Sequence, residues 1–445
     1  MAGRVRFVIL LHSHQPVGNF DSVIEEAYQK SYLPFLNGFE EFPEIPVTMH
    51  YSGCLLEWIE QKHPEYFARL AAHTGKAKKA APGKQWEMMG GGMQEPILTL
   101  LHERDRQGQI HMMADYLKKH FGSKPKGGWL TERVWEPALA STLADAGVEY
   151  ITLDDTHFKA AGFTEEQLGG CYLAEDQGRS TRVYPASEKL RYLIPYAPVH
   201  EVIAYLKSLV PAEGERVLCY ADDGEKFGVW PKTYEHCYRD GWLKNFLGAL
   251  KHEQNQGWLQ ISTLGEVNAS IHPQGFAYLP ENSYREMTEW ALPAKALAAF
   301  EKAWDSCKDD PRLKDVLPLL KGGNWRSFRV KYPESMRMYA KMMEVSAKVA
   351  ALDPAAKLTE MARNSLYRGQ CNCPYWHGIF GGAYLRHIRV ATSRQDGSHV
   401  LDVVLASVQL RLGTGIVDTD EKSTLAHYCK EEYIRSPYYI TIGSF

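Results

Sequence analysis

The sequence predicts an α/β fold with a parallel barrel of seven or eight strands as its main body. Short apolar runs alternate with longer helical patterns from residue 4 to about residue 265, as in consecutive βα units. Several of these runs are continuously apolar or β-branched, which is typical of strands that are covered on both faces. Polar residues gather where the runs end, as they do around the mouth of a barrel. A doubly wound open sheet is the alternative.

The barrel elements follow from the apolar runs and from the helical periodicity between them. The runs predict these strands: Arg4–His12, Ile45–Tyr51, Gln85–Met89, Gly127–Leu130, Glu149–Asp154, Arg216–Tyr220 and Trp258–Thr263. The periodic segments predict these helices: Asp21–Phe39, Leu55–Ala72, Glu103–Phe121, Ala138–Ala146 and Tyr234–Gln254. The interval Lys159–Leu209 breaks this rhythm with polar and Gly-rich pieces, and is expected to be an excursion on the barrel rim.

After residue 265 the pattern becomes helical. The expected segments are Glu281–Asp305, Pro311–Lys321, Pro333–Leu352 and Ala355–Tyr367. The tail carries a strand-like run followed by polar residues and forms no obvious domain of its own. We therefore predict a catalytic barrel over 1–270, a helical domain over 271–390 and an atypical tail over 391–445.

Composition excludes several classes of protein. The 445 residues are 44% hydrophobic and 24% charged, as in ordinary globular proteins. The net charge of −3 gives no reason to expect nucleic acid or an anionic membrane as partner. The start, MAGRVRFVILLHSHQP, indicates a first strand and no signal peptide. No apolar stretch approaches the ~20 residues that span a bilayer.

The eight cysteines are scattered, which indicates a reduced protein without a disulfide framework and predicts a cytoplasmic location. Cys371 and Cys373 are two residues apart but lack a second pair, so their spacing does not predict a zinc site. Aromatic residues make up 12% of the chain, and large rings suit sugar faces as well as a filled core. The oligomeric state is not predicted.

Polar clusters come at the ends of the expected strands. In chain order these clusters hold His12 and His14, then Glu87 and Glu95, then Trp129, Glu132, Arg133 and Glu136, then Asp154 and Asp155, then Asp222, Asp223 and Glu225. Because the carboxyl ends of barrel strands meet around one hollow, we expect a single site there. Each cluster also has a local explanation: His14 can cap a turn, and Glu132 can pair with Arg133 at the rim.

Two kinds of chemistry use such residues. Two carboxylates from different strands can act as nucleophile and proton donor in glycoside cleavage, without a metal. A His-x-His at the end of a first strand, here His12 and His14, can instead bind a metal together with an Asp from a late strand. The spacing alone favours neither.

Five segments carry a more specific signal: HSHQPVGNF, QWEMMGGGMQEP, GWLTERVWEP, YADDGEKFG and QCNCPYWHGIFGGAYL. In content and order they resemble the five sequence regions of glycoside hydrolase family 57, closest to its 4-α-glucanotransferase and α-amylase members. The likeness runs from about residue 4 to about residue 390, nearly nine-tenths of the chain. Five such segments in order are far more specific than any one alone.

The resemblance implies a (β/α)7 barrel followed by helices that complete the active site. It implies an enzyme that acts on α-1,4-glucans or maltooligosaccharides with retention of configuration, without metal or cofactor. It assigns the nucleophile to Glu132 and the acid/base to Asp223, the Asp before Gly-Glu in YADDGEKFG. The other residues that it implies would line the sugar subsites, namely His14, Glu87, Trp129, Glu225 and Trp376, with His12 as a neighbour.

Alternation along a strand places Asp222 and Asp223 on opposite sides. The resemblance selects Asp223 for the barrel mouth, and Glu225 can return to the same side, bind sugar hydroxyls and raise the pKa of a nearby acid. Asp222 is then expected to pair with Arg or Lys behind the barrel wall. Retention requires the carboxyls of Glu132 and Asp223 to lie roughly 5–5.5 Å apart.

The acceptor decides between two outcomes. Water as acceptor makes an α-amylase, and a hydroxyl of a second glucan makes a 4-α-glucanotransferase. The sequence leaves this open, although Tyr284, Trp290 and Trp325 are expected to cover the cleft and favour transfer. Two other hypotheses also stay open, namely a metal-dependent deacetylase-like hydrolase built on His12 and His14, and an inactive, truncated relic that binds glucan.

The sequence departs from the family pattern at two places. In some relatives the residue two before the Tyr of the fifth segment is an acid that contacts substrate, whereas here it is Cys373, and a thiol accepts hydrogen bonds weakly. Relatives also continue into a C-terminal β-sandwich domain. This chain ends about 55 residues after YLRHIR, so the sandwich is expected to be absent and the tail to be a remnant of it.

Overall fold

A computed structural model gives the fold of residues 3–74, 86–122 and 124–378, with short stretches and single positions between 382 and 399. The tail that the sequence analysis assigns to 391–445 lies almost wholly outside these described residues, as does Gln85. Within the tail, β10 (Arg394–Gln395) and β11 (Ser398–His399) form a short antiparallel pair. The predicted boundaries between the barrel, the helical domain and the tail stay predictions.

The main body is a closed ring of parallel strands, which confirms the predicted α/β barrel. The ring is built from β1 (Arg4–Ser13), β2 (Thr48–Tyr51), β3 (Glu87–Met88), β4 (Gly127–Gly128), β5 (Tyr150–Asp154), β7 (Arg179–Ala186) and β8 (Glu215–Asp223). Its strand order is β3-β2-β1-β8-β7-β5-β4. The ring closes between β3 and β4, where Gly90 N donates to Gly127 O at 2.9 Å and Trp129 N donates to Gly90 O at 2.8 Å.

One strand of the ring differs from the prediction. The expected rim excursion contains a hairpin, in which β6 (Tyr172–Asp176) pairs antiparallel with β7, and β7 takes a place in the ring. Gln177 and Gly178 form its two-residue turn, both with positive φ (52° and 77°), as type I′ hairpins require. The expected strand Trp258–Thr263 is instead the short β9 (Leu259–Ile261), which pairs with the amino half of β1.

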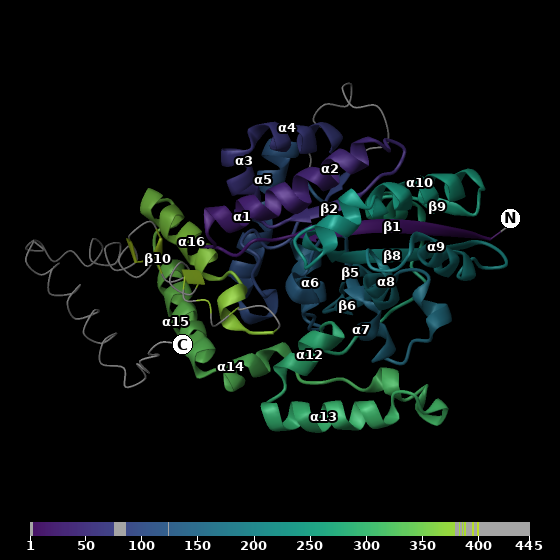
Figure 1. The fold of residues 1–445 in the computed structure, drawn as a ribbon. Helices are drawn as coiled ribbons and strands as arrows, with labels where there is room; N and C mark the ends of the chain where they lie inside the picture. The colour runs from purple at the N-terminus through teal and green to yellow at the C-terminus, as the bar shows by residue number, and fades with distance from the viewer. Residues whose placement is uncertain are drawn as a thin grey trace, which may run out of the picture.

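Helices cover the outside of the ring (Figure 1). Those between the strands are α1 (Asp21–Ala27), α2 (Leu33–Glu40), α3 (Gly53–Lys62), α4 (Pro64–His73), α5 (Glu103–Phe121), α6 (Leu139–Asp145), α7 (Asp155–Lys159), α8 (Glu188–Leu193), α9 (Val199–Ser208) and α10 (Trp242–Asn255). Helix α11 (Leu264–Ser270) follows β9, and its Leu264 and Val267 join the cluster inside the barrel. Helix α5 has its predicted bounds, because it ends at Gly122 in the left-handed conformation (φ 92°) that stops a helix.

The helical part after the barrel comprises α12 (Arg285–Ala291), α13 (Ala294–Cys307), α14 (Phe328–Lys331), α15 (Pro333–Ala350) and α16 (Lys357–Gly369). In Figure 1, β1 runs from the N-terminus toward the end of the molecule where α15 and α16 lie. These helices therefore stand beside the carboxyl ends of the barrel strands. Helix α13 lies at the outer edge of the molecule, below the barrel in this view.

Side chains of the strands alternate between two apolar clusters. On β1, Val8 and Leu10 join a cluster that fills the barrel, whereas Phe7, Ile9 and Leu11 pack against the surrounding helices. This period of two is the geometry of a strand. Because both faces are buried, β1 is apolar throughout its middle, and only its last residues can bring polar groups to the mouth.

Candidate active site

Asp223 and Glu132 lie at the barrel mouth, at the carboxyl ends of two different strands. On β8, alternate residues from Val217 to Ala221 belong to the cluster inside the barrel, so Asp223 faces the same side. Glu132 follows β4 in a tight turn (Thr131–Arg133). Both residues are partly exposed.

Glu132 is held in an unusual backbone conformation by residues of the helical part. Its φ of 52° and ψ of 20° lie in the left-handed region, which costs a non-glycine residue on the order of 1 kcal/mol. The Ser283 hydroxyl donates to the Glu132 carbonyl oxygen at 2.5 Å, and the Tyr284 hydroxyl donates to Glu132 Oε2 at 2.8 Å. Two residues just before α12 therefore fix the orientation of Glu132, which itself belongs to the barrel.

The pKa values of Glu132 and Asp223 are both raised. Burial raises the pKa of Glu132 above its ordinary value, and the charge of Asp223 raises it further. Burial also raises the pKa of Asp223, with the charge of Asp222 next. Two acids that each resist ionisation and share one hollow are suited to holding one proton between them.

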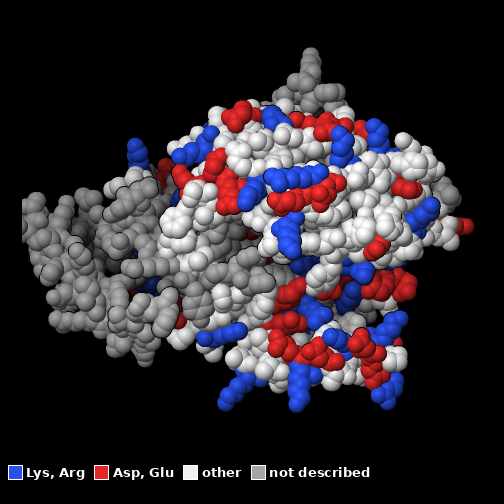
Figure 2. Space-filling view, in the orientation of Figure 1, with Lys and Arg blue, Asp and Glu red and all other residues white. Residues whose placement is uncertain are grey.

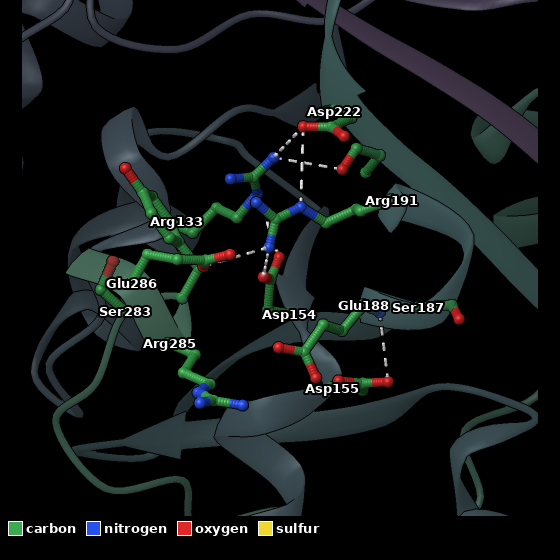
Figure 3. Close-up of polar contacts among 12 residues, drawn as sticks. Arg133, Asp154, Asp155, Ser187, Glu188, Arg191, Asp222, Ser283, Arg285 and Glu286 are labelled. Atoms are coloured by element: carbon green, nitrogen blue, oxygen red, sulfur yellow. Dashed lines mark hydrogen bonds and ion pairs between the residues drawn. The ribbon is translucent and has the colours of Figure 1, made fainter. Parts of the chain in front are cut away.

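A buried network of charges lies behind this pair (Figure 3). Asp154 pairs with Arg133 Nε at 3.1 Å and with Arg191 Nη1 at 2.7 Å. Asp222 pairs with Lys226 and, at 3.4 Å, with Arg133 Nη2. Burial raises the pKa of Asp222, but Lys226 and the two arginines bring it below its ordinary value. Asp222 is therefore ionised and paired with basic residues, as the sequence analysis expects.

Glu225 stands beside Asp223 at the same mouth. Its Oε1 accepts hydrogen bonds from the His14 backbone N–H at 3.0 Å and from the Tyr32 hydroxyl at 2.5 Å. Burial raises its pKa to about 7, and the charge of Asp223 contributes to the rise. Near neutral pH this partly exposed carboxyl can both donate and accept hydrogen bonds, which suits sugar hydroxyls.

A second group at the mouth joins His12, His50 and Glu95. The Nδ1 atoms of the two imidazoles are 2.8 Å apart, and Glu95 Oε1 lies 3.6 Å from His12 Nε2. Burial lowers the pKa of His50 to about 3 and that of His12 well below its usual value, and it raises the pKa of Glu95 to about 8. The group is therefore uncharged at neutral pH. Trp129 stacks on His12 with ring centroids 4.6 Å apart.

The segment after α16 packs against this group. The Asn372 backbone N–H and Nδ2 both donate to the Glu95 carbonyl oxygen, at 3.0 and 2.9 Å. Trp376 Nε1 donates to Asn372 Oδ1 at 2.8 Å. This anchoring brings Cys373 Sγ within 3.1 Å of His14 Nε2. The helical part thus supplies the far wall of the mouth.

Aromatic residues of the helical part form one cluster at this wall. Trp376 stacks on Trp290 with ring centroids 6.1 Å apart, and Tyr284 meets Trp290 edge-on. Trp325 belongs to the same cluster and is only 3% exposed. Trp325 is therefore a core residue of the wall, and covering the cleft remains a prediction for Trp290 and Tyr284.

Comparison with known proteins agrees with this architecture. The family model described as glycosyl hydrolase family 57 matches residues 8–280. The chain belongs to this family. A model for the middle domain of alpha-amylases and 4-alpha-glucanotransferases matches residues 323–395 of this family 57 protein.

Relatives of this family 57 chain are named as two kinds of enzyme. The chain is 43% identical to a 4-alpha-glucanotransferase of Thermococcus litoralis, over 87% of this chain and 56% of that protein. It is also 43% identical to alpha-amylase 1 of Dictyoglomus thermophilum, over 88% of this chain and 56% of that protein. The chain therefore spans a little over half the length of these relatives.

Solved structures agree with the fold. The crystal structure of 4-alpha-glucanotransferase from Thermococcus litoralis superposes with a TM-score of 0.81 at 43% identity, over 88% of this chain and 59% of that one. A branching enzyme of family 57 from Thermococcus kodakaraensis has a TM-score of 0.62 at 13% identity, over 92% of this chain and 94% of that one. At that identity it supports the fold alone.

Glu87 lies away from the other predicted site residues of this family 57 chain. It opens β3 opposite Thr48, the first residue of β2, and so lies at the amino ends of the strands. It accepts hydrogen bonds from Thr48 Oγ1 at 3.0 Å, from Gly265 N at 2.8 Å and from the Tyr150 hydroxyl. The prediction that Glu87 lines a sugar subsite is therefore wrong. Its hydrogen bond with Gly265 links α11 to the amino-terminal end of the barrel.

Glu95 and His50 lie at the mouth but are absent from the predicted sugar-binding residues, and Tyr284 was expected only to cover the cleft. Glu95 was noted at a strand end, but Glu87 was preferred over it, whereas the structure places Glu95 at the mouth. His50 is the third of the four residues of β2 and belongs to none of the five segments that carry the resemblance. Tyr284 reaches Glu132 from 152 residues away, so no local spacing could reveal it. Glu95 also has a positive φ of 54°, a feature that clusters at functional sites.

The charge network should dominate the stability of the mouth. Replacing Asp154 with Asn leaves two buried arginines with less compensation, and we expect the free energy of unfolding to fall by about 3–5 kcal/mol. Urea unfolding followed by circular dichroism measures this. Asp145→Asn is the matched control, because Asp145 pairs with Arg179 at the surface and such pairs contribute less than about 1 kcal/mol. Equal losses in the two variants would contradict the expectation.

Proposed function

We propose that this chain is a retaining enzyme that acts on α-1,4-glucans, with Glu132 as nucleophile and Asp223 as acid/base. The observation that carries the proposal is the placement of these two partly exposed carboxyls at one barrel mouth, where each has a raised pKa and the charge of Asp223 acts on Glu132. The names of the relatives, 4-alpha-glucanotransferase and alpha-amylase, support the same substrate class.

The mechanism has two displacement steps. Protonated Asp223 donates its proton to the glycosidic oxygen while the Glu132 carboxylate attacks the anomeric carbon, so the glycosidic bond breaks and a glycosyl-enzyme ester forms. Asp223 then takes a proton from the acceptor hydroxyl, whose oxygen displaces Glu132 from the anomeric carbon. His14, His12, Trp129, Glu225 and Trp376 are proposed to bind the sugar rings, with Glu95 in place of Glu87.

Product analysis with maltoheptaose tests the function and separates hydrolysis from transfer. Products longer than the substrate show a 4-α-glucanotransferase, and short sugars alone show an α-amylase. An unchanged substrate that still binds by calorimetry would overturn the enzyme and leave a glucan-binding relic. We propose no cofactor for this reaction.

The metal-dependent alternative has less support. It needs His12, His14 and an Asp around one ion, but His12 meets His50 and Glu95, whereas His14 meets Cys371 and Cys373. Among the described residues no group of potential ligands joins His12, His14 and an aspartate. A loss of glucan conversion on treatment with chelator would revive this alternative.

The Tyr284 hydroxyl is expected to set the acidic limb of the pH profile. Its hydrogen bond lowers the pKa of Glu132, against burial and the charge of Asp223, which raise it. Tyr284→Phe should therefore raise this pKa. Because the nucleophile must be ionised, the acidic limb of the kcat/KM profile should move to higher pH. Tyr278→Phe, at an exposed tyrosine that bonds to Glu175, should leave the profile unchanged, and an unmoved limb in Tyr284→Phe would contradict this role.

We also propose that the protein is cytoplasmic. Seven cysteines within the described part of the chain are free thiols, which supports a reducing, cytoplasmic compartment.

No helix among the described residues is long and apolar enough to cross a bilayer. Figure 2 shows acidic and basic side chains interspersed on the face that carries α13. The absence of a nucleic-acid or membrane partner stays a prediction.

A further inference from the structure

Three potential metal ligands, His14, Cys371 and Cys373, lie together at the mouth, and the two thiols have no part in the proposed chemistry. His14 Nε2, Cys371 Sγ and Cys373 Sγ all lie within 4.8 Å of one another, and the His14 and Cys373 atoms are 3.1 Å apart. We infer that these three residues form a site for a thiophilic divalent cation such as Zn²⁺, and that the bound cation blocks glucan binding.

The donor set fits zinc in number, type and spacing. Zinc takes thiolate and imidazole ligands, and with Zn–S of about 2.3 Å and Zn–N of about 2.0–2.1 Å, tetrahedral ligand atoms lie roughly 3.5–3.8 Å apart. The His14 Nε2–Cys373 Sγ distance of 3.1 Å is a few tenths of an ångström below this spacing, and no two of the donor atoms are more than 4.8 Å apart. The sequence spacing did not predict a zinc site, because the third donor lies more than 350 residues before the cysteines.

The surroundings hold the donors in place. His14 Nδ1 lies 2.9 Å from Ser52 Oγ, so a proton on Nδ1 can be donated to this hydroxyl while the Nε2 lone pair faces the sulfurs. Such an outer partner is what fixes a metal-binding imidazole. Between the cysteines, Asn372 is locked to the Glu95 carbonyl by two hydrogen bonds. The cysteine segment is therefore positioned by the fold.

The position of the cluster explains why the cation would block the site. Cys371 is fully buried and Cys373 is partly exposed, so a cation would reach the cluster from the side of Cys373. The His14 backbone N–H also binds Glu225, which is proposed to bind sugar hydroxyls. With three protein ligands, a tetrahedral cation would keep a fourth position for water or another ligand. Blocking rests on the proposed function, whereas metal binding stands by itself.

Metal binding is tested on the full metal-free chain by calorimetry with Zn²⁺ and by the absorption spectrum with Co²⁺. We expect one tightly bound ion and a thiolate-to-cobalt charge-transfer band. Cys371→Ser and Cys373→Ser should each weaken zinc binding by more than about 100-fold. Cys307→Ser, at a partly exposed thiol on α13, should change neither binding nor activity. Absence of the band, or native affinity in Cys373→Ser, overturns the site.

The blocking effect is tested separately with maltoheptaose. Zinc should stop glucan conversion by the native chain, chelator should restore it, and Cys373→Ser should be insensitive to zinc. Zinc that binds without slowing conversion overturns the blocking and leaves the metal site intact. If the metal-free chain converts no glucan, the proposed function fails, while the cobalt spectrum still decides the metal site and competition between zinc and maltoheptaose in calorimetry decides the blocking.

Discussion

Replacing Glu132 with Gln is expected to lower kcat on maltoheptaose by more than about 10⁴-fold, because loss of the proposed nucleophile removes the covalent route. The amide keeps the size of the side chain and can still meet the Tyr284 hydroxyl, so the mouth should keep its shape. Thermal unfolding should therefore stay close to that of the native chain. The reaction is followed by the rate at which reducing ends or longer glucans appear.

Glu136→Gln is the matched control for this variant. Glu136 belongs to the same segment but pairs with Arg326, with distances of 2.7 and 2.8 Å, so its loss should leave kcat within a few-fold of native. A second experiment adds azide to the Glu132→Gly variant. Azide should attack the anomeric carbon directly, restore turnover and give a glycosyl azide of inverted configuration. More than a few per cent of native activity in Glu132→Gln would remove Glu132 from the nucleophile role.

Most of the barrel could be predicted because its strands are covered on both faces and read as apolar runs. The hairpin β6–β7 escaped prediction for a physical reason. Strand β7 contains Pro185, and its first half, at the amino-terminal end of the barrel opposite the mouth, carries Arg179 and Arg182. Proline and charge both argue against a central strand. The turn at Gln177-Gly178 was the available signal, since a glycine in a two-residue turn favours a hairpin.

The sequence predicted those site residues that directly follow an expected strand. Asp223 could be separated from Asp222 by alternation along β8, and the structure agrees, since Asp222 lies among the buried cations. Glu87 was misplaced because β3 is only two residues long, so a residue at its start was taken for one at its end. Contacts such as Tyr284 with Glu132, or Asn372 with Glu95, join parts of the chain far apart in sequence, and only the fold shows them.

Replacing Asp223 with Asn is expected to lower kcat on maltoheptaose by about 10²–10⁴-fold, the usual contribution of a general acid. On α-maltosyl fluoride the first step should be much less affected, because fluoride leaves without being protonated. Azide should then accelerate the second step and give a product of retained configuration, since it needs no deprotonation to attack the glycosyl-enzyme. Equal losses on both substrates would show that Asp223 does not deliver the proton. The pair of variants thus distinguishes the two carboxyls by the configuration of the azide product, inverted for Glu132→Gly and retained for Asp223→Asn.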